Sequence, residues 1–228
     1  MPKKTRAIKI TDEKKAWNRK SIPSAYRVES IPMNKTILIV CEGQTEKLYF
    51  EAFPVLGLRV DAINLEGQSK LKMVESTQEL LFGSDVIYDE IWCVFDMDVK
   101  RGADEFSDFD NAIVKAEGLG YRVAYSNDAF ELWFYLHFEY TDAEHLRSFY
   151  YEELGKKFGF NYEKEGKKYA FCQSLYSILN ELEGSSQEKA IERARSLFEN
   201  KKELPYYQQN PVTMVYKLVK ELNRNLRR

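Results

Sequence analysis

Strand-like and helix-like segments alternate along the chain from residue 36 to residue 126. The run TILIVC (36–41) is apolar and rich in β-branched residues, which is typical of a strand buried on both faces. Further strand-like runs follow at 59–65, 90–96 and 121–126, each separated from the next by a helix-like segment. This alternation predicts an α/β fold with a mostly parallel sheet flanked by helices on both faces.

The segments between these strands have helical spacing of their apolar residues. Residues 45–53 form the first, with Thr45 as a plausible N-cap, and residues 70–82 form the second, which Gly83 should end. A third helix is predicted at 108–120.

The strand-like pattern stops near residue 130, and only helical patterns follow. These are at 130–138, 142–157, 168–182, 186–199 and 211–225, the last with Asn210 as cap and Pro211 in its first turn. The sequence therefore predicts three parts, which are a basic N-terminal arm at 1–35, an α/β domain at 36–137 and an all-helical C-terminal part at 138–228.

Composition is that of a globular protein. Of 228 residues 44% are hydrophobic, which is enough for a sizeable core. The three cysteines are far apart and show no paired spacing, so we expect reduced thiols and, without a recognisable signal peptide, a cytoplasmic protein. The longest apolar runs are far shorter than the roughly 20 residues of a membrane helix, so no membrane span is expected.

Charge is distributed unevenly along the chain. Residues 1–35 contain ten Lys and Arg against three acidic residues, and the tail from Lys217 contains five against one. Because the whole chain has a net charge of −2, residues 36–216 carry −13. The basic ends are either solvated segments or electrostatic contacts for the phosphates of a nucleic acid.

Acidic residues follow two of the predicted strands. Glu42 comes directly after the strand at 36–41, and Asp96 and Asp98 stand at the end of the strand at 90–96, in VFDMD. Since ligand sites in open α/β sheets form outside the carboxyl ends of the strands, we expect the three carboxylates to converge. Carboxylate oxygens suit Mg²⁺ or Mn²⁺, and such a site would act on a phosphate.

Several neighbouring residues are candidates for the same site, each with a structural alternative. Glu46 is either a second carboxylate near the metal or an acid favoured by the helix dipole. Asn127 and Glu131 are extra ligands or orienting groups, or else an N-cap and first-turn pair. Gly43 should allow a tight turn after Glu42. Lys164 belongs to a basic loop, NYEKEGKKY, that could contact phosphate.

This arrangement resembles the Toprim fold of topoisomerases, primases and related nucleases. In that family a glutamate after the first strand acts as general acid/base or metal ligand, and a DxD pair binds divalent metal. The resemblance implies these roles for Glu42, Asp96 and Asp98. The sequence departs from the DxDxD form of the motif at Lys100, which leaves a two-metal site in doubt. Lys100 and Arg101 could instead contact phosphate.

Four longer stretches together resemble the RloB (AbiLii) family. They are IVCEGQTEKLYFEAF, VFDMD, AYSNDAFELWFYLHF and NPVTMVYKLVKEL, which span about residues 36 to 222. Asp128 stands where the family pattern leads us to expect proline, a change that a turn tolerates. The resemblance implies a Toprim-like nuclease, a hydrolase of RNA such as tRNA or of DNA. It would serve as effector of an antiviral abortive-infection system with an ATPase partner of the RloA (AbiLi) type.

Two other readings stay open. A DxD motif also occurs in haloacid-dehalogenase phosphatases, but these place it on the first strand, whereas here an earlier strand carries its own acid. The other alternative is a non-catalytic Toprim-like binding or sensor subunit of the ATPase complex, which Lys100 and the aromatic C-terminal part favour. The excess of Tyr and Phe in 138–228 also predicts a surface for the ATPase partner.

Overall fold

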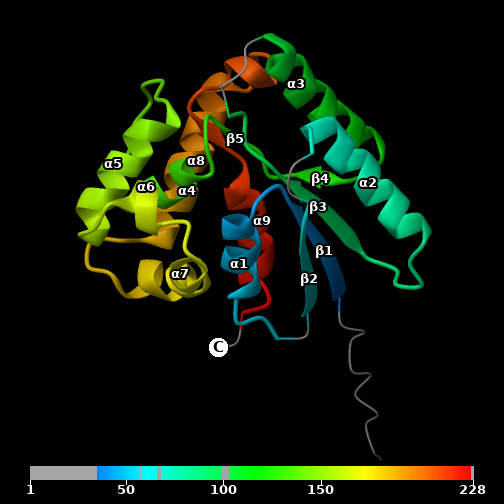
Figure 1. Cartoon of the computed structure of the whole chain (residues 1–228), viewed down its shortest axis with the longest axis horizontal. Helices are drawn as coiled ribbons and strands as arrows, with labels where there is room; N and C mark the ends of the chain where they lie inside the picture. Colours follow the sequence, from blue (N-terminus) through cyan, green and yellow to red (C-terminus); the bar gives the residue numbers. More distant parts are fainter. Residues whose placement is uncertain (1–34, 57, 66–67, 99–102, 227–228) are drawn as a thin grey trace, which may run out of the picture. The chain divides into compact units, whose positions relative to one another are not determined.

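A computed structural model describes residues 35–56, 58–65, 68–98 and 103–226. From Lys35 onwards they form one compact unit (Figure 1). The predicted basic arm, except Lys35, lies outside the described residues. No helix in the described ranges combines the length and apolarity needed to cross a bilayer.

Four parallel strands form the central sheet in the order β2-β1-β3-β4. The strands are β1 (Lys35–Cys41), β2 (Leu58–Asn64), β3 (Glu90–Val94) and β4 (Arg122–Val123). Ile37 to Cys41 are fully or almost fully buried, because β1 lies in the middle of the sheet with helices over both faces. The predicted parallel sheet is thereby confirmed.

The helices between the strands cover both faces of the sheet. These helices are α1 (Gln44–Glu51), α2 (Lys70–Phe82) and α3 (Ala103–Gly118). Because β2 lies on one side of β1, and β3 and β4 lie on the other, right-handed crossovers place α1 on one face and α2 with α3 on the other. Figure 1 shows this arrangement, with α9 on the same side of the sheet as α1.

Helix α2 has the predicted bounds, and its ends show why. The Ser69 hydroxyl accepts a hydrogen bond from the Lys72 amide at the start, and Gly83 ends the helix. Its buried face consists of Lys70, Met73, Val74 and Thr77, whereas Leu80 is 39% exposed.

The C-terminal part consists mainly of helices. They are α4 (Glu131–Tyr135), α5 (Arg147–Phe158), α6 (Tyr162–Glu165), α7 (Tyr169–Glu181), α8 (Gln187–Lys201), the short 3-10 helix η3 (Tyr206–Gln208) and α9 (Val215–Asn223).

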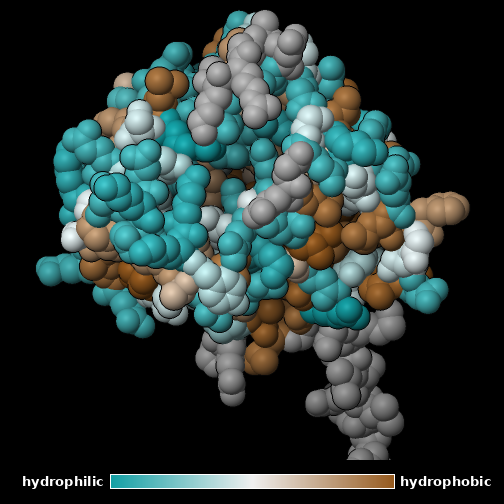
Figure 2. Space-filling view, viewed as in Figure 1, coloured by the Kyte–Doolittle hydropathy of each residue, from teal (hydrophilic) through white to brown (hydrophobic). Residues whose placement is uncertain are grey.

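Figure 2 shows one face of the protein as mostly hydrophilic, with hydrophobic residues gathered on the side of α2 and the strands.

The prediction that this part is all-helical is wrong at one place. Strand β6 (Val212–Thr213) pairs antiparallel with β5 (Ser126–Asn127), and the Ser126 and Thr213 hydroxyls are hydrogen bonded at 2.8 Å. The last helix consequently begins at Val215, so that Asn210 and Pro211 do not form its start. The short β5–β6 ladder fixes the segment that follows β4 against the C-terminal part.

Helix α9 fastens the end of the chain to the start of the sheet. The Lys35 ammonium lies 2.5 Å from carboxylate oxygens of both Glu90 on β3 and Glu221 on α9. Leu226 forms an isolated antiparallel bridge with Val55, between α1 and β2. The C-terminal residues therefore pack on the α/β part of the same unit.

Most of the aromatic residues of the C-terminal part pack against one another. Phe158, Phe160, Tyr162 and Phe171 form one cluster with ring centroids 5.0–6.5 Å apart. They stabilise the packing of α5, α6 and α7, which explains much of the aromatic content that the sequence suggested could serve a partner.

Candidate active site

The topology brings the ends of β1 and β3 to one place. The chain leaves β1 towards β2 on one side and leaves β3 towards β4 on the other, so the gap between their carboxyl ends is a topological switch point. Glu42 follows β1, and its amide donates to the Val94 carbonyl of β3 at 3.0 Å. Asp96 follows β3 and bridges to Ser126. The predicted convergence of the two strand ends is therefore present.

A cavity of about 280 Å³ opens at this switch point. Five carboxylates line it, together with the cationic side chains of two further residues. The carboxylates belong to Glu42, Glu46, Asp96, Asp98 and Glu131, and the cations to Arg147 and Lys167. The predicted acids after both strands thus share one cavity with Glu46 and Glu131.

The guanidinium of Arg147, the first residue of α5, lies among these carboxylates. Its Nη2 atom is 2.5 Å from Asp96 Oδ2, and its Nη1 atom is 3.4 Å from Asp98 Oδ1. Its Nε atom is 3.9 Å from Glu131 Oε2 and has no hydrogen-bond partner within the described structure. Burial opposes the charge of Arg147, but Asp96, Glu131 and Asp98 outweigh it and raise its pKa.

Asp128 holds this arrangement in position. Its side chain accepts a hydrogen bond from the Arg147 amide at 2.9 Å, which caps the start of α5, and its carbonyl accepts one from the Asp98 amide at 3.0 Å. Asp98 has a φ of +48°, in the left-handed region that Asp tolerates better than most residues. Asp128 therefore does more than occupy a turn, which was all that the sequence indicated.

Burial and mutual repulsion perturb the carboxylates. Burial, followed by the charge of Asp96, raises the pKa of Glu42 to about 7, although the Lys70 ammonium at 3.6 Å opposes the shift. The same two causes raise the pKa of Glu46 to about 8. Burial also raises the pKa of Glu131, against the opposing charge of Arg147. These carboxyl groups are therefore held in surroundings that disfavour their charged forms, and a bound cation would offset that effect.

Gly43 has a packing role in this site. Its backbone is extended, with φ −132° and ψ 165°. The predicted tight turn therefore does not explain why a glycine stands at this position. A Cβ atom at this position would lie 2.5 Å from Glu46 Oε2. The absence of a side chain at Gly43 therefore makes room for the Glu46 carboxylate.

The donor set of this cavity has the chemistry that Mg²⁺ and Mn²⁺ prefer, but Arg147 occupies the space between the donors. Among the described residues, no three His, Cys, Asp or Glu side chains are placed closely enough to hold a metal ion. A cation bound by Asp96 and Asp98 would therefore require the guanidinium of Arg147 to move away from them.

The other predicted site residues lie elsewhere. The Asn127 side chain donates to the carbonyls of Tyr206 and Tyr207, so it orients η3 and is not part of the cavity lining. Lys164 is exposed on α6, and it is Lys167, three residues later, that lines the cavity. Lys100 and Arg101 lie outside the described residues.

Sequence reasoning missed two cations of the site, Arg147 and Lys70, whereas Lys167 belongs to the basic loop that was predicted to contact phosphate. Arg147 lies more than 40 residues from any of the acids at the strand ends, in a segment with no motif. Lys70 is the first residue of α2 and was counted as a helical residue, although it is only 7% exposed. Only the convergence of unpaired acids hinted that buried cations would be needed nearby.

The parallel sheet, with a carboxylate-lined cavity at its switch point, defines an α/β protein whose cavity lies where such sheets commonly bind ligands. The family model for RloB-like proteins matches residues 37–222, and the chain belongs to this family. The matched range contains all five carboxylates as well as Arg147 and Lys167. Comparisons with curated proteins and with solved structures give no significant match.

Proposed function

We propose that this protein is a divalent-metal-dependent phosphodiesterase that cleaves a nucleic acid, RNA or DNA. The observation that carries the proposal is the convergence of Glu42, Asp96 and Asp98 in one open cavity at the sheet switch point. Two further carboxylates in that cavity, Glu46 and Glu131, leave it with more acid than its own cations balance. Excess carboxylate at the mouth of a parallel sheet suits a metal and a phosphate together.

Each residue then has a role. Asp96 and Asp98, with Glu42, would hold Mg²⁺ or Mn²⁺, which when bound polarises a phosphoryl group and acidifies water. Glu42 lies at the rim of the cavity with its side chain 27% exposed, where it can exchange a proton with water. Lys167 and a displaced Arg147 guanidinium would contact the phosphate, since both face the cavity.

The biological setting belongs to the same proposal. As the RloB resemblance implies, the protein would act in the cytoplasm as the effector of an anti-phage abortive-infection system, together with an ATPase subunit. Exposed hydrophobic residues of the C-terminal part, Leu146, Tyr169 and Leu204, offer contact area for that subunit.

One observation favours a second candidate, a non-catalytic Toprim-like binding or sensor subunit of the ATPase complex. Arg147 pairs with Asp96 and Asp98, and a permanent internal cation would replace the metal. In that case Arg147 would only stabilise the fold, and a variant without Arg147 would gain no nuclease activity.

A cleavage assay separates the two. Purified protein, with and without the ATPase, is incubated with tRNA, total RNA and single- and double-stranded DNA in Mg²⁺, Mn²⁺ or chelator. We expect metal-dependent cleavage that Asp96→Ala abolishes. Because Asp96 also binds Arg147, Asp98→Asn, which keeps the side-chain shape, is the second variant, and Asp61→Asn on β2 is the control. Cleavage that survives in chelator, or in Asp98→Asn, would refute the proposal.

A further inference from the structure

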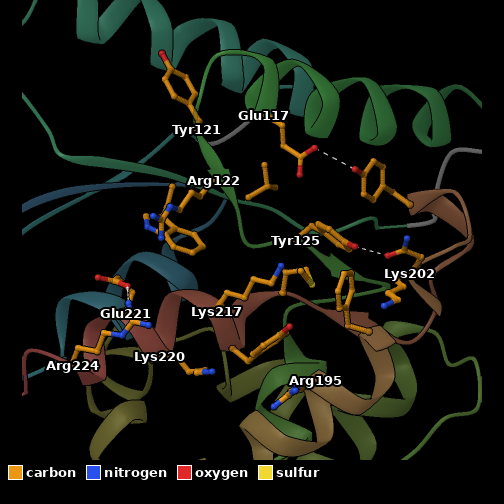
Figure 3. A pocket seen from close by; sticks show the side chains of 17 residues that line it. Glu117, Tyr121, Arg122, Tyr125, Arg195, Lys202, Lys217, Lys220, Glu221 and Arg224 are labelled. Atoms are coloured by element: carbon orange, nitrogen blue, oxygen red, sulfur yellow. Dashed lines mark hydrogen bonds and ion pairs between the residues drawn. The ribbon is translucent and has the colours of Figure 1, made fainter. Parts of the chain in front are cut away.

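A second cavity, of about 640 Å³, lies between the β4 end of the sheet and helices α8 and α9 (Figure 3). Residues of β3, β4 and the end of α3 line one wall, and residues of η3, α8 and α9 line the other. Among the described residues it shares no lining residue with the carboxylate cavity. Its volume is in the range of small-molecule sites, about 300–1,000 Å³.

Cations outnumber acids in the lining of this second cavity. Six basic side chains face two acidic ones, Glu117 and Glu221. The basic residues are Arg122, Arg195, Lys202, Lys217, Lys220 and Arg224. The basic tail noted in the sequence thus contributes Lys217, Lys220 and Arg224 to one cavity, on a chain whose net charge is negative.

Half of these cations are already paired. Arg224 is 2.5 Å from Glu221, Arg122 is 3.2 Å from Glu90, and Lys202 is 2.9 Å from Glu199. Arg195, Lys217 and Lys220 have no carboxylate within 4 Å among the described residues. These three cations on α8 and α9 are exposed and have no direct ion-pair partner in the described part of the chain, although Glu117 and Glu199 lie near enough to act on Lys217.

Lys217 reaches into the cavity without a direct ion-pair partner among the residues that the structure describes. Figure 3 shows Lys217 extending from α9 towards the middle of the cavity. Its ammonium lies 4.9 Å from the centre of the Phe198 ring, and burial lowers its pKa. An anion bound beside Lys217 would supply the missing partner.

Aromatic and apolar side chains form the rest of the cavity. Trp92 and Tyr125 are almost fully buried, so they form the floor of the cavity and offer no free ring face. The exposed Arg122 guanidinium lies 5.4 Å from the centre of the Trp92 ring, and Tyr121 and Tyr206 are partly exposed, so these are the planar groups that a ligand can reach. Flat arginine and aromatic groups stack on nucleobases, and unpaired lysines bind phosphates. An inorganic anion would use only the cationic side of this lining.

We propose that this cavity binds a nucleoside phosphate, with the base against the exposed Arg122 guanidinium of β4 and the phosphates between α8 and α9. The site goes beyond the proposed phosphodiesterase activity and does not depend on it. The same chemistry is available from a free nucleotide or from one nucleotide of a strand. An acidic protein segment would also neutralise the cations but would leave the stacking surfaces unused.

Titration calorimetry tests the proposal with the full-length protein in chelator, so that cleavage plays no part. The probes are ATP, AMP, inorganic pyrophosphate, a ten-nucleotide single-stranded RNA and a poly-glutamate peptide. We expect ATP to bind in a saturable manner and more tightly than pyrophosphate. If the ten-nucleotide RNA binds and ATP does not, the natural ligand is one nucleotide of a nucleic acid. If ATP binds, the natural ligand is a free nucleotide.

The variant Lys217→Gln/Lys220→Gln should weaken nucleotide binding about tenfold or more, because each lost charged contact is worth more than 1 kcal/mol. The matched control is Lys156→Gln/Lys189→Gln, two exposed lysines outside the cavity with the same change of charge. If the first variant unfolds, Arg195→Gln on α8 replaces it. Equal affinities of variant and control, equal binding of pyrophosphate and ATP, or preferred binding of poly-glutamate would overturn the proposal.

Discussion

The Arg147 guanidinium is the counter-charge of Asp96, Asp98 and Glu131, and its removal should destabilise the protein strongly. The Arg147 side chain is 15% exposed and that of Asp96 is 9% exposed, with 2.5 Å between their charged atoms. Removing one partner of a buried ion pair costs about 3–5 kcal/mol, because the other charge stays buried without compensation. Lys70 and Lys167 lie nearby, so we expect Arg147→Met to lower the free energy of unfolding by about 2–4 kcal/mol.

Urea denaturation at pH 7.5 in chelator measures this loss. Arg59→Met is the matched control, because Arg59 pairs with Asp61 at 2.9 Å but is 55% exposed. An exposed pair contributes about 0–1 kcal/mol, so the control should be nearly neutral. The double variant Arg147→Met/Asp96→Asn should recover part of the loss, since it removes the uncompensated charge. Equal stability of Arg147→Met and Arg59→Met would refute the reasoning.

Two further predictions concern stability. His137 is buried, its Nδ1–H donates to the Trp133 carbonyl at 2.9 Å, and burial lowers its pKa from 6.5 to about 4. Below pH 6.5 the unfolded chain therefore binds a proton that the folded chain does not, so stability should fall by up to about 3 kcal/mol between pH 6.5 and 4. Urea titrations across this range should show a shallower fall in His137→Gln, and parallel curves would contradict the assignment. Gly43→Ala should lower the free energy of unfolding by about 1–3 kcal/mol, because its Cβ meets the buried Glu46 carboxylate. Gly118→Ala, which meets nothing within 4 Å, is the control for the same urea measurement, and a similar effect of both would disprove this packing role.

The parts of the fold that local pattern determines could be predicted from the sequence. The bounds of α2 follow from its cap at Ser69 and its stop at Gly83, and the alternation of strands and helices gave the parallel sheet. The meeting of Glu42 with Asp96 followed from a general property of such sheets, in which strand ends share one edge.

The rest depends on contacts between distant segments. Strand β6 has only two residues and is defined by its pairing with β5, 85 residues earlier, which no local pattern shows. The Arg147 position depends on Asp128 and on the path of the chain between α4 and α5. The Asn127 side chain was expected at the acidic site for its place after a strand, but it turns towards η3, which only the tertiary structure reveals.

The central claim, that the carboxylates at the switch point hold a divalent cation, is tested most directly by a Mn²⁺ titration followed by electron paramagnetic resonance. The account predicts saturable binding in the wild type, its loss in Asp98→Asn, and tighter binding in Arg147→Met, where the competing guanidinium is gone. Asp61→Asn, on β2 and outside the cavity, should bind as the wild type does. Absence of saturable Mn²⁺ binding in both the wild type and Arg147→Met, or equal binding in Asp98→Asn, would contradict the account.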